Sequence, residues 1–234
     1  MADNSENVLN HISFIMDGNG RWAKKRLMPR EFGHKQGAKK FREIVQYCLH
    51  DKGIKYVSVY AFSTENWKRP DGEVKGILNL FVEYMNTCIK ENDENKTRVR
   101  FLGNRSVFSE EIQAKMAETE LVTSKYERTM GICINYGGRD EIVDAVNKLI
   151  SEGKTHITAD DITNNIYTGI MPPPDMIVRT GGEYRLSNYF MWQSAYSELF
   201  FTKTLWPDLT KKEVDELIEE YKSRQRNFGG VKNA

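Results

Sequence analysis

Asp17 stands where an apolar run, FIM, gives way to two glycines and a basic segment within FIMDGNGRWAKK, residues 14–25. The Asp-Gly and Asn-Gly pairs favour type I′ turns and could join two strands of a hairpin. However, residues 33–50 carry apolar side chains at helical spacing. A strand, a glycine turn and a helix would instead place free backbone N–H groups where they can bind an anion. The local sequence leaves both interpretations open.

Three polar clusters follow predicted strands: DGNGRW at 17–22, FSTENWKRPDGE at 62–73 and RTGGEYRLSN at 179–188. They supply four arginines and four carboxylates: Arg21, Arg69, Arg179, Arg185, Asp17, Glu65, Glu73 and Glu183. Arginine binds phosphate oxygens bidentately, and ligands of open α/β sheets gather at the carboxyl ends of the strands. Surface solvation would explain any one of these arginines, but it explains four at strand ends poorly. We therefore predict a polyphosphate site.

Several known motifs are absent or incomplete. There is no GxxxxGK[ST] phosphate loop, and DGNG lacks the full GxGxxG dinucleotide fingerprint, which disfavours a nucleotide-dependent enzyme. A calcium loop starting at Asp17 would need Gly where Trp22 stands and Glu where Met28 stands. DDITN at 160–164 resembles an aspartate-rich metal motif, but we interpret it as a helix cap.

The elements that would position these residues alternate along the chain. Short β-branched and apolar runs predict strands at 11–16, 56–62, 99–104, 131–138 and 175–180. Helical spacing predicts helices at 41–49, 76–92, 109–122, 140–150 and 213–224, the last with Thr210 and Glu213 in capping-box register. Alternating strands and helices predict a single α/β domain with a central, mostly parallel sheet flanked by helices.

The composition is that of an ordinary globular protein. The chain has 234 residues, of which 29% are charged, and its net charge of +1 gives no field that would attract nucleic acid. Three cysteines without CxxC spacing argue against a zinc site or a disulfide framework. No apolar stretch is long enough to span a membrane, and the polar N-terminus does not resemble a signal peptide. We expect a cytoplasmic protein.

Five segments carry a family resemblance: HISFIMDGNGRWAKK, FGHKQGAKKFREIV, YAFSTENWKRPDGEV, NYGGRDEIVDAV and RTGGEYRLSNYFMWQSAYSELFFTKTLWPD. Their order and content resemble the cis-prenyltransferases, above all the bacterial undecaprenyl diphosphate synthases. The resemblance implies a domain over 11–230 after a flexible segment, 1–10. It also implies a homodimer, helices that enclose an apolar tunnel, and Mg2+ dependence.

The implied reaction joins isopentenyl diphosphate to an allylic diphosphate, expected to be farnesyl diphosphate. The expected product is a long polyprenyl diphosphate, most of all undecaprenyl diphosphate as a cell-wall lipid carrier, with transient contact to a membrane surface for its release. Two alternatives stay open: a short- or medium-chain synthase, because side-chain bulk at the far end of the tunnel sets product length, and a non-catalytic partner subunit of the same fold.

The resemblance also assigns residues. Asp17 and Asn66 are the catalytic candidates, and Asp17 with Glu198 would hold the metal. The residues implied for the allylic diphosphate are Gly18, Asn19, Gly20, Arg21, Trp22, Arg30 and His34, with the mobile segment Ser63, Thr64, Glu65, Trp67 and Arg69. Those implied for isopentenyl diphosphate are Arg179, Arg185, Leu186 and Ser187. RNFGG at 226–230 resembles the family's C-terminal signature.

Other roles fit some of these residues. His34 could lie on a helix surface, and Trp22 and Trp67 could be core aromatics. Glu73 and Glu183 are better interpreted as groups that orient arginines. An amide is a weak base, so we expect Asn66 to orient a substrate while a diphosphate oxygen accepts the proton. The apolar faces of 41–49 and 77–89 fit a core or a tunnel wall equally well.

Overall fold

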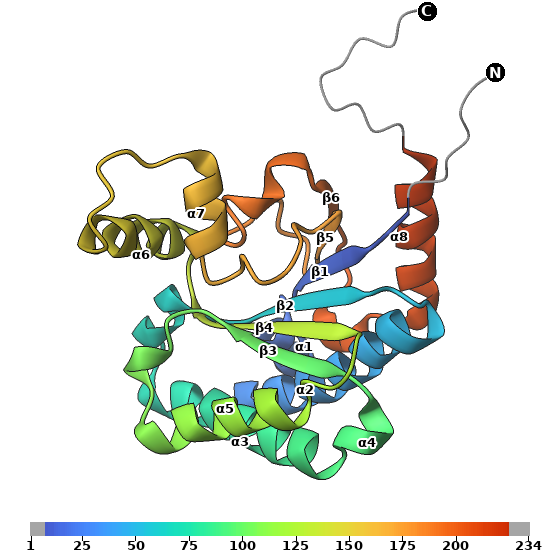
Figure 1. Cartoon of the computed structure of the whole chain (residues 1–234). Helices are drawn as coiled ribbons and strands as arrows, with labels where there is room; N and C mark the ends of the chain where they lie inside the picture. The colour runs from blue at the N-terminus through green and yellow to red at the C-terminus, as the bar shows by residue number, and fades with distance from the viewer. Residues whose placement is uncertain (1–7, 225–234) are drawn as a thin grey trace, which may run out of the picture.

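The computed structural model describes residues 8–224, which form one α/β domain (Figure 1). Its centre is a six-stranded sheet in the order β3-β4-β2-β1-β5-β6, and all five neighbouring pairs are parallel. The strands are β1 (His11–Ile15), β2 (Tyr56–Ser63), β3 (Arg98–Leu102), β4 (Thr129–Tyr136), β5 (Met176–Arg179) and β6 (Glu198–Phe201). The predicted parallel α/β domain is confirmed.

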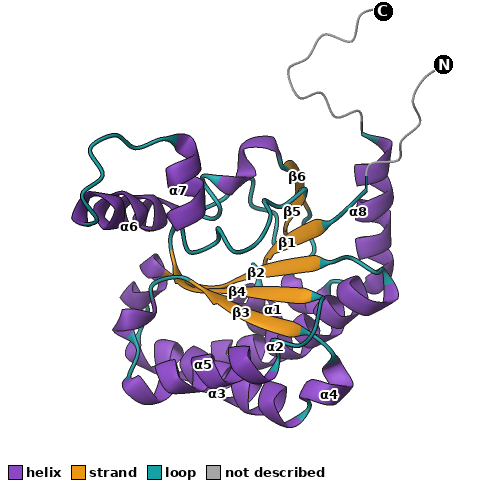
Figure 2. Cartoon of the chain, viewed as in Figure 1, coloured by secondary structure: helices purple, strands orange, loops and turns teal. Residues whose placement is uncertain are grey.

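Eight α-helices connect or flank these strands in the described chain (Figure 2). They are α1 (Asn19–Lys25), α2 (Arg30–Gln46), α3 (Asp71–Lys90), α4 (Asn92–Asn95), α5 (Glu110–Val122), α6 (Gly138–Ser151), α7 (Ala159–Asn165) and α8 (Lys211–Ser223). A turn of π-helix, Tyr47–Asp51, continues α2, and a 3₁₀ helix η2, Thr64–Lys68, follows β2. No helix within residues 8–224 is long and apolar enough to cross a membrane.

The two faces of the sheet are covered differently. On one face the alternate residues Ile12 and Phe14 of β1 join a large core with the apolar sides of α2, α3, α5 and α8. On the other face Ile15 packs in a smaller core with irregular chain that includes Tyr189 and Phe190. Figure 2 shows loops on this side of the sheet, between α7 and the strands β1 and β5. A sheet buried on both faces explains the nearly continuous apolar strands.

Several predicted boundaries need correction. The helix predicted from Phe41 begins at Arg30, and the one predicted from residue 76 begins at Asp71. The strand β6, Glu198–Phe201, was not predicted. The hairpin interpretation of DGNG is wrong, because the chain enters α1 after β1. The cap interpretation of DDITN is right: Asp161 and Thr158 form a reciprocal capping box at the start of α7. The signature at 226–230 lies outside the described residues.

The sheet has a topological switch between β1 and β5. The chain leaves β1 towards β2 on one side, whereas β5 adds to the other side of β1. Chain segments leaving the two strands therefore diverge, and a crevice forms at their carboxyl ends. Asp17 follows β1 and Arg179 ends β5 at this point. The fold thus brings together the first and third polar clusters predicted from the sequence.

A buried histidine ties β1 to its neighbours. The Nδ1–H group of His11 donates to the carbonyl of Pro172 at 2.7 Å, and Nε2 lies 2.8 Å from the hydroxyl of Ser58 on β2. Burial lowers the pKa of His11 to about 4, although the carbonyl of Pro172 and the carboxylate of Asp175 oppose this shift. The histidine is therefore neutral in the folded protein at neutral pH.

This arrangement predicts acid sensitivity. Between pH 6.5 and about 4 the unfolded chain binds a proton at His11 that the folded chain does not, so stability falls as the pH falls. We expect His11 to account for a loss of roughly 2–3 kcal/mol in the free energy of unfolding between pH 7 and 4.5. Urea titrations of wild type and His11→Asn at both pH values measure it. An equal pH dependence in both proteins would exclude His11 as the titrating group.

Candidate active site

The centre of the candidate site is an ion pair across the β1–β5 crevice. The Arg179 guanidinium donates from Nη2 to Oδ2 of Asp17 at 3.0 Å, and only 6% of its side chain is exposed. Nη1 of Arg179 donates to the hydroxyl of Ser187 at 2.8 Å and to the carbonyl of Arg185. Arg21, one turn into α1, lies 3.2 Å from Oδ1 of Asp17. Asp17 therefore faces two cations at the edge of the sheet.

The turn after Asp17 requires glycine. Gly18 is the N-cap of α1 with φ of 108°, a left-handed conformation that most residues avoid. A β-carbon at Gly18 would also lie 2.8 Å from the side chain of Leu205. The turn directs the first backbone N–H groups of α1, at residues 19–21, out of the helix, where no intrahelical acceptor exists for them. This is the anion-binding geometry expected from the sequence.

A polar cavity of about 600 Å³, here called the anion pocket, opens beside this turn. It is bounded by the first turn of α1 and the first turns of α2, so the positive ends of two helices meet there. Its lining includes Asp17, Gly18, Asn19, Gly20, Arg21, Arg30, His34 and Arg69. Most of the residues assigned by resemblance to an allylic diphosphate therefore share one cavity.

Glu73, in the first turn of α3, holds three of the basic side chains around this pocket. Its Oε1 accepts from Arg69 at 2.9 Å and Arg30 at 3.3 Å, and lies 3.2 Å from Nε2 of His34. Burial raises the pKa of Glu73, but Arg69, His34 and Arg30 outweigh it and hold the pKa below its usual value. Burial lowers the pKa of His34 despite Glu73. Glu73 is thus an ionised carboxylate that positions these groups.

An apolar cavity of about 460 Å³ lies between α2 and α3 and reaches the sheet. Its walls include Phe41 from α2, Ile77 and Phe81 from α3, and Val59 and Ile132 from the sheet. Three residues line both this cavity and the anion pocket: Met16, Asn19 and His34. The apolar cavity therefore borders the anion pocket along these three residues. The apolar faces of residues 41–49 and 77–89, which fitted a core or a tunnel wall equally well, thus form part of a cavity wall.

Tyr84 and Arg42 close the far end of the apolar cavity. Both also line a smaller space of about 50 Å³ farther along α2 and α3. The hydroxyl of Tyr84 donates to the sulfur of Met130 at 3.4 Å, and its ring packs edge-on against Phe41. Arg42 donates to the hydroxyl of Thr87 at 2.9 Å, with its guanidinium 5.6 Å from the Tyr84 ring. These two side chains form a partition between the two spaces.

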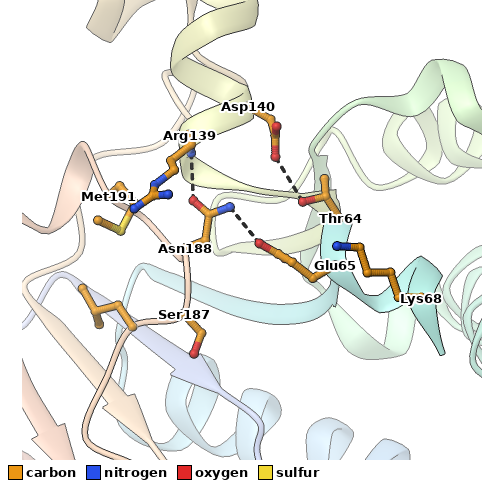
Figure 3. A pocket seen from close by; sticks show the side chains of 9 residues that line it. Thr64, Glu65, Lys68, Arg139, Asp140, Ser187, Asn188 and Met191 are labelled. Atoms are coloured by element: carbon orange, nitrogen blue, oxygen red, sulfur yellow. Dashed lines mark hydrogen bonds between the residues drawn. The ribbon is translucent and has the colours of Figure 1, made fainter.

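A second polar cavity has a volume of about 630 Å³, and Figure 3 shows residues that line it. It contains Leu186 and Ser187 of the third cluster together with Thr64, Glu65 and Lys68 of the second. Its other lining residues are Arg139, Asp140, Asn188 and Met191. Because Arg179 binds both Asp17 and Ser187, it lies between this cavity and the anion pocket.

Asn188 holds the second cavity together. Its side-chain oxygen accepts from the backbone N–H of Arg139 at 2.9 Å, and its amide donates to Glu65 at 3.0 Å (Figure 3). Thr64 donates to Asp140 at 3.0 Å across the same opening. Ser187 and Asn188 both have positive φ, of 51° and 63°, a conformation that is unfavourable for serine but tolerated by asparagine. These hydrogen bonds hold a strained turn beside Arg179.

The structure separates some residues that the sequence grouped. Thr64 and Glu65 line the second cavity with Leu186 and Ser187, whereas Arg69 lines the anion pocket. Arg185 is exposed and donates to Glu183 at 2.6 Å, so Glu183 orients an arginine as expected. The backbone N–H of Ser63 donates to the side-chain oxygen of Asn66 at 3.2 Å. The two residues form a capping box at the start of η2, which engages the side-chain oxygen of Asn66.

Trp22, Trp67 and Glu198 do not line either polar cavity. The indole N–H of Trp22 donates to Asp208 at 2.6 Å, and that of Trp67 donates to Asn135 at 2.8 Å. Glu198 begins β6 opposite Met176, at the amino end of the sheet, and its carboxylate pairs with Arg224 at 2.7 Å. Asp17 lies at the opposite end of the sheet, after the carboxyl end of β1. Within a single chain, the carboxylates of Asp17 and Glu198 therefore cannot bind the same metal ion.

Sequence reasoning missed Lys68, Arg139 and Asn188. Arg139 follows β4, as Asp17 follows β1, and the same strand-end rule would have found it. Lys68 and Asn188 lie within clusters that were recognised, but only their arginines and hydroxyls were selected. No local signal marks Asn188, because its role depends on a contact with Glu65, 123 residues away.

A parallel α/β sheet with a basic pocket at its switch point and an apolar cavity beside that pocket suits an enzyme that acts on an amphipathic anion. Residues 15–229 match the family described as "Putative undecaprenyl diphosphate synthase". The chain therefore belongs to the undecaprenyl diphosphate synthase family and is a prenyltransferase enzyme.

Known relatives cover nearly the whole chain. The isoprenyl transferase of Fusobacterium nucleatum is 48% identical over 229 residues, which are 97% of this chain and 99% of that protein. The isoprenyl transferase of Thermotoga maritima is 46% identical over 228 residues, 95% of this chain and 97% of that protein. These names support isoprenyl transfer and do not specify a chain length.

Solved structures confirm the fold. A probable undecaprenyl diphosphate synthase from Campylobacter jejuni has a TM-score of 0.80 and 31% identity, covering 96% of this chain and 100% of that one. Lavandulyl diphosphate synthase from Lavandula x intermedia, solved with dimethylallyl diphosphate, has a TM-score of 0.88 and 28% identity, covering 95% and 98%. The same fold thus serves enzymes with different prenyl products.

The anion pocket predicts a difference between two neighbouring arginines. We expect Arg30→Ala to weaken inorganic diphosphate binding about tenfold, the lower range for losing a charge-assisted hydrogen bond. Arg26→Ala should change it little, because the Arg26 guanidinium lies 4.0 Å over the Trp22 ring and pairs with Asp208. Titration calorimetry of both variants measures the difference. Equal losses would show that net surface charge, and not the pocket, binds the anion.

Proposed function

We propose that the enzyme condenses isopentenyl diphosphate with an allylic diphosphate, with farnesyl diphosphate as the primer and a long-chain product such as undecaprenyl diphosphate. The observation that carries the proposal is that the apolar cavity and the anion pocket adjoin, with Met16, Asn19 and His34 lining both. A prenyl diphosphate has the same two parts, an anionic head and an apolar tail. Lavandulyl diphosphate synthase, with the same fold, binds dimethylallyl diphosphate, itself an allylic diphosphate.

The anion pocket is the proposed site of the allylic diphosphate. The N–H groups at residues 19–21, with Arg21 and Arg30, would bind the diphosphate oxygens. Cleavage of the allylic carbon–oxygen bond increases the negative charge on the leaving diphosphate. Donors fixed beforehand around the pocket therefore stabilise the transition state more than the substrate. Glu73 positions Arg30, Arg69 and His34 for this purpose.

The second cavity is the proposed site of isopentenyl diphosphate. Ser187 lines this cavity, and Arg179, which bonds Ser187, and the exposed Arg185 would bind the diphosphate from outside its lining. Lys68 and Arg139 add positive charge within the lining. Because Arg179 lies between the two cavities, the double bond of one substrate would face the allylic carbon of the other. Holding both substrates in place turns a bimolecular encounter into a positioned reaction.

Asp17 is the proposed Mg2+ ligand. Its side chain is 31% exposed at the edge of the anion pocket, and residues 8–224 contain no cluster of three or more His, Cys, Asp or Glu side chains suited to a metal. This fits Mg2+, which commonly binds one or two carboxylates together with substrate phosphates. When bound, the ion supplies Lewis-acid stabilisation of the leaving group. The Asp17 carboxylate also pairs with Arg179 and Arg21.

The proton released after bond formation needs an acceptor. The side-chain oxygen of Asn66 already accepts from the backbone of Ser63, and an amide is a weak base. We therefore assign the proton to a diphosphate oxygen and assign Asn66 to the positioning of η2. Glu65 and Thr64, held by Asn188 and Asp140, belong to the same segment.

A homodimer is proposed through the α6 side of the molecule. Val143 and Ile150 lie seven residues apart on one face of α6 and are 55% and 58% exposed. Ile170, Met191 and Tyr196 add further exposed apolar side chains. Exposed apolar side chains that gather on one side of a protein are typical of protein interfaces. Glu198 could act as a metal ligand only if a second chain brought it to Asp17. Sedimentation of wild type and Val143→Glu tests the dimer.

Replacement of Asp17 tests the reaction. Asp17→Asn keeps the size of the side chain but removes its charge, so we expect turnover to fall by roughly a hundred- to a thousandfold. Affinity for the allylic diphosphate without metal should stay the same or rise, because a negative charge beside the anion is lost. Single-turnover rates with farnesyl and isopentenyl diphosphates, beside calorimetry, measure both effects. Asp160→Asn, which makes the same change at an exposed aspartate of α7 outside both polar cavities, is the matched control. Near-normal turnover of Asp17→Asn would refute the assignment.

Replacement of Tyr84 tests product length. Tyr84→Ala should join the 460 Å³ cavity to the 50 Å³ space beyond it, so that the growing chain extends by at least one isoprene unit before it stops. Tyr84→Phe keeps the ring, and its products should match those of wild type. Mass spectrometry of the lipid products gives the chain lengths. Unchanged lengths in Tyr84→Ala would mean that the chain leaves the cavity by another route.

A further inference from the structure

The loop between α1 and α2 exposes a leucine in an unfavourable conformation. Leu27 is 97% exposed and has φ of 55°. The N–H of Met28 donates to the carbonyl of Ala23, and the N–H of Leu27 to that of Lys24. These are the two hydrogen bonds of a Schellman motif, in which Leu27 occupies the position that favours glycine. A β-carbon is disfavoured at this position in any L residue other than Asn or Asp.

Packing within the fold does not account for this leucine. Phe190 also has positive φ, of 48°, but its side chain is 1% exposed and packs in the smaller core. Leu27 makes no such compensating contact, since almost all of its surface is open. Glycine would satisfy the backbone better and expose less apolar surface. Leu27 therefore combines an unfavourable backbone conformation with an exposed apolar side chain, and neither stabilises the fold. This combination indicates a contact with a partner outside the chain.

The surroundings of Leu27 indicate the chemistry of that contact. Met28 and Phe32 are 40% and 38% exposed. Lys24 and Lys25 form the last turn of α1, both exposed, and neither forms an ion pair with a residue of the 8–224 range. An apolar tip beside exposed lysines matches the interface of an anionic lipid bilayer, where the tip enters the acyl boundary and the ammonium groups meet lipid phosphates.

The position of the loop is consistent with this partner. Leu27, Met28 and Pro29 lie at the rim of the anion pocket, next to Arg30. We propose that residues 24–29 dock the protein on an anionic bilayer, with the mouth of the anion pocket facing the membrane. The proposal rests on the proposed function in one respect, since only a lipid product needs to leave the site into a bilayer. The docking itself involves no substrate.

Vesicle sedimentation without substrate tests the docking. Wild-type protein should sediment with vesicles of phosphatidylglycerol and phosphatidylcholine, and Leu27→Gly should lower the partition coefficient by roughly tenfold. Leu27→Gly should melt at the same temperature as wild type or higher, because glycine suits the left-handed position. Leu121→Ser removes another leucine, 74% exposed on α5, and is the matched control, with no expected change. Equal binding by wild type and Leu27→Gly, or equal losses in both variants, would overturn the proposal.

Charge is tested separately. The double variant Lys24→Gln, Lys25→Gln should bind the anionic vesicles at least tenfold more weakly, and its residual binding should resemble that of wild type to pure phosphatidylcholine. High salt should reduce wild-type binding in the same way. Unchanged binding of the double variant to anionic vesicles would contradict the role of the lysines.

A fluorescent label reports where the loop goes. The three native cysteines, Cys48, Cys88 and Cys133, are buried, so Leu27→Cys can be labelled selectively with an environment-sensitive dye. Its emission should shift to the blue on addition of anionic vesicles, whereas a label at Leu121→Cys should not respond. A shift that depends on protein concentration without vesicles would show self-association through the loop and would overturn the proposal. A vesicle-dependent shift supports it whether or not prenyl transfer is detected.

Discussion

A guanidinium group that is almost fully buried must be paired, because an isolated charge in the protein interior costs several kcal/mol. Arg179 meets this requirement with the carboxylate of Asp17, the hydroxyl of Ser187 and the carbonyl of Arg185. Those three partners come from the segment after β1 and the segment after β5. The need to pair one cation thus fixes the two sides of the crevice relative to each other. Both polar cavities depend on it.

The sequence predicted the strands that are buried on both faces and missed the element that depends on tertiary contacts. The runs at β1 to β5 are rich in β-branched residues, which makes them recognisable without a partner. The four residues of β6 form a strand because they pair with β5 at the edge of the sheet. The first part of α2 is polar and contains two glycines, which disfavour a helix locally. A β-carbon at Gly33 would lie 2.1 Å from the carbonyl oxygen of Asn19, so glycine there allows α2 to reach the anion-binding turn.

The sequence predicted which residues form the candidate site but not how they are distributed between the two polar cavities. Placement after strands was enough to select Asp17, Arg179 and Arg69, because parallel strands end at one edge of a sheet. The assignment to cavities depends on side-chain direction. Within η2 and the residues that follow it, Glu65 reaches Asn188 on one side while Arg69 reaches Glu73 on the other. The indole N–H of Trp22 donates to Asp208, which is 186 residues away, so no local pattern could have indicated this hydrogen bond.

The carboxylate of Glu73 has a consequence for selectivity among anions. Glu73 already pairs with three basic side chains of the pocket, Arg30, Arg69 and His34. An incoming anion must therefore compete with the Glu73 carboxylate for these groups. Coulomb energy grows with the charge of the ligand, whereas the energy lost from the internal pairs stays the same. A singly charged anion, such as chloride, would therefore gain less from these three basic groups than a diphosphate would. If the pocket holds the allylic diphosphate, as proposed, Glu73 would set a minimum charge for any ligand that binds there.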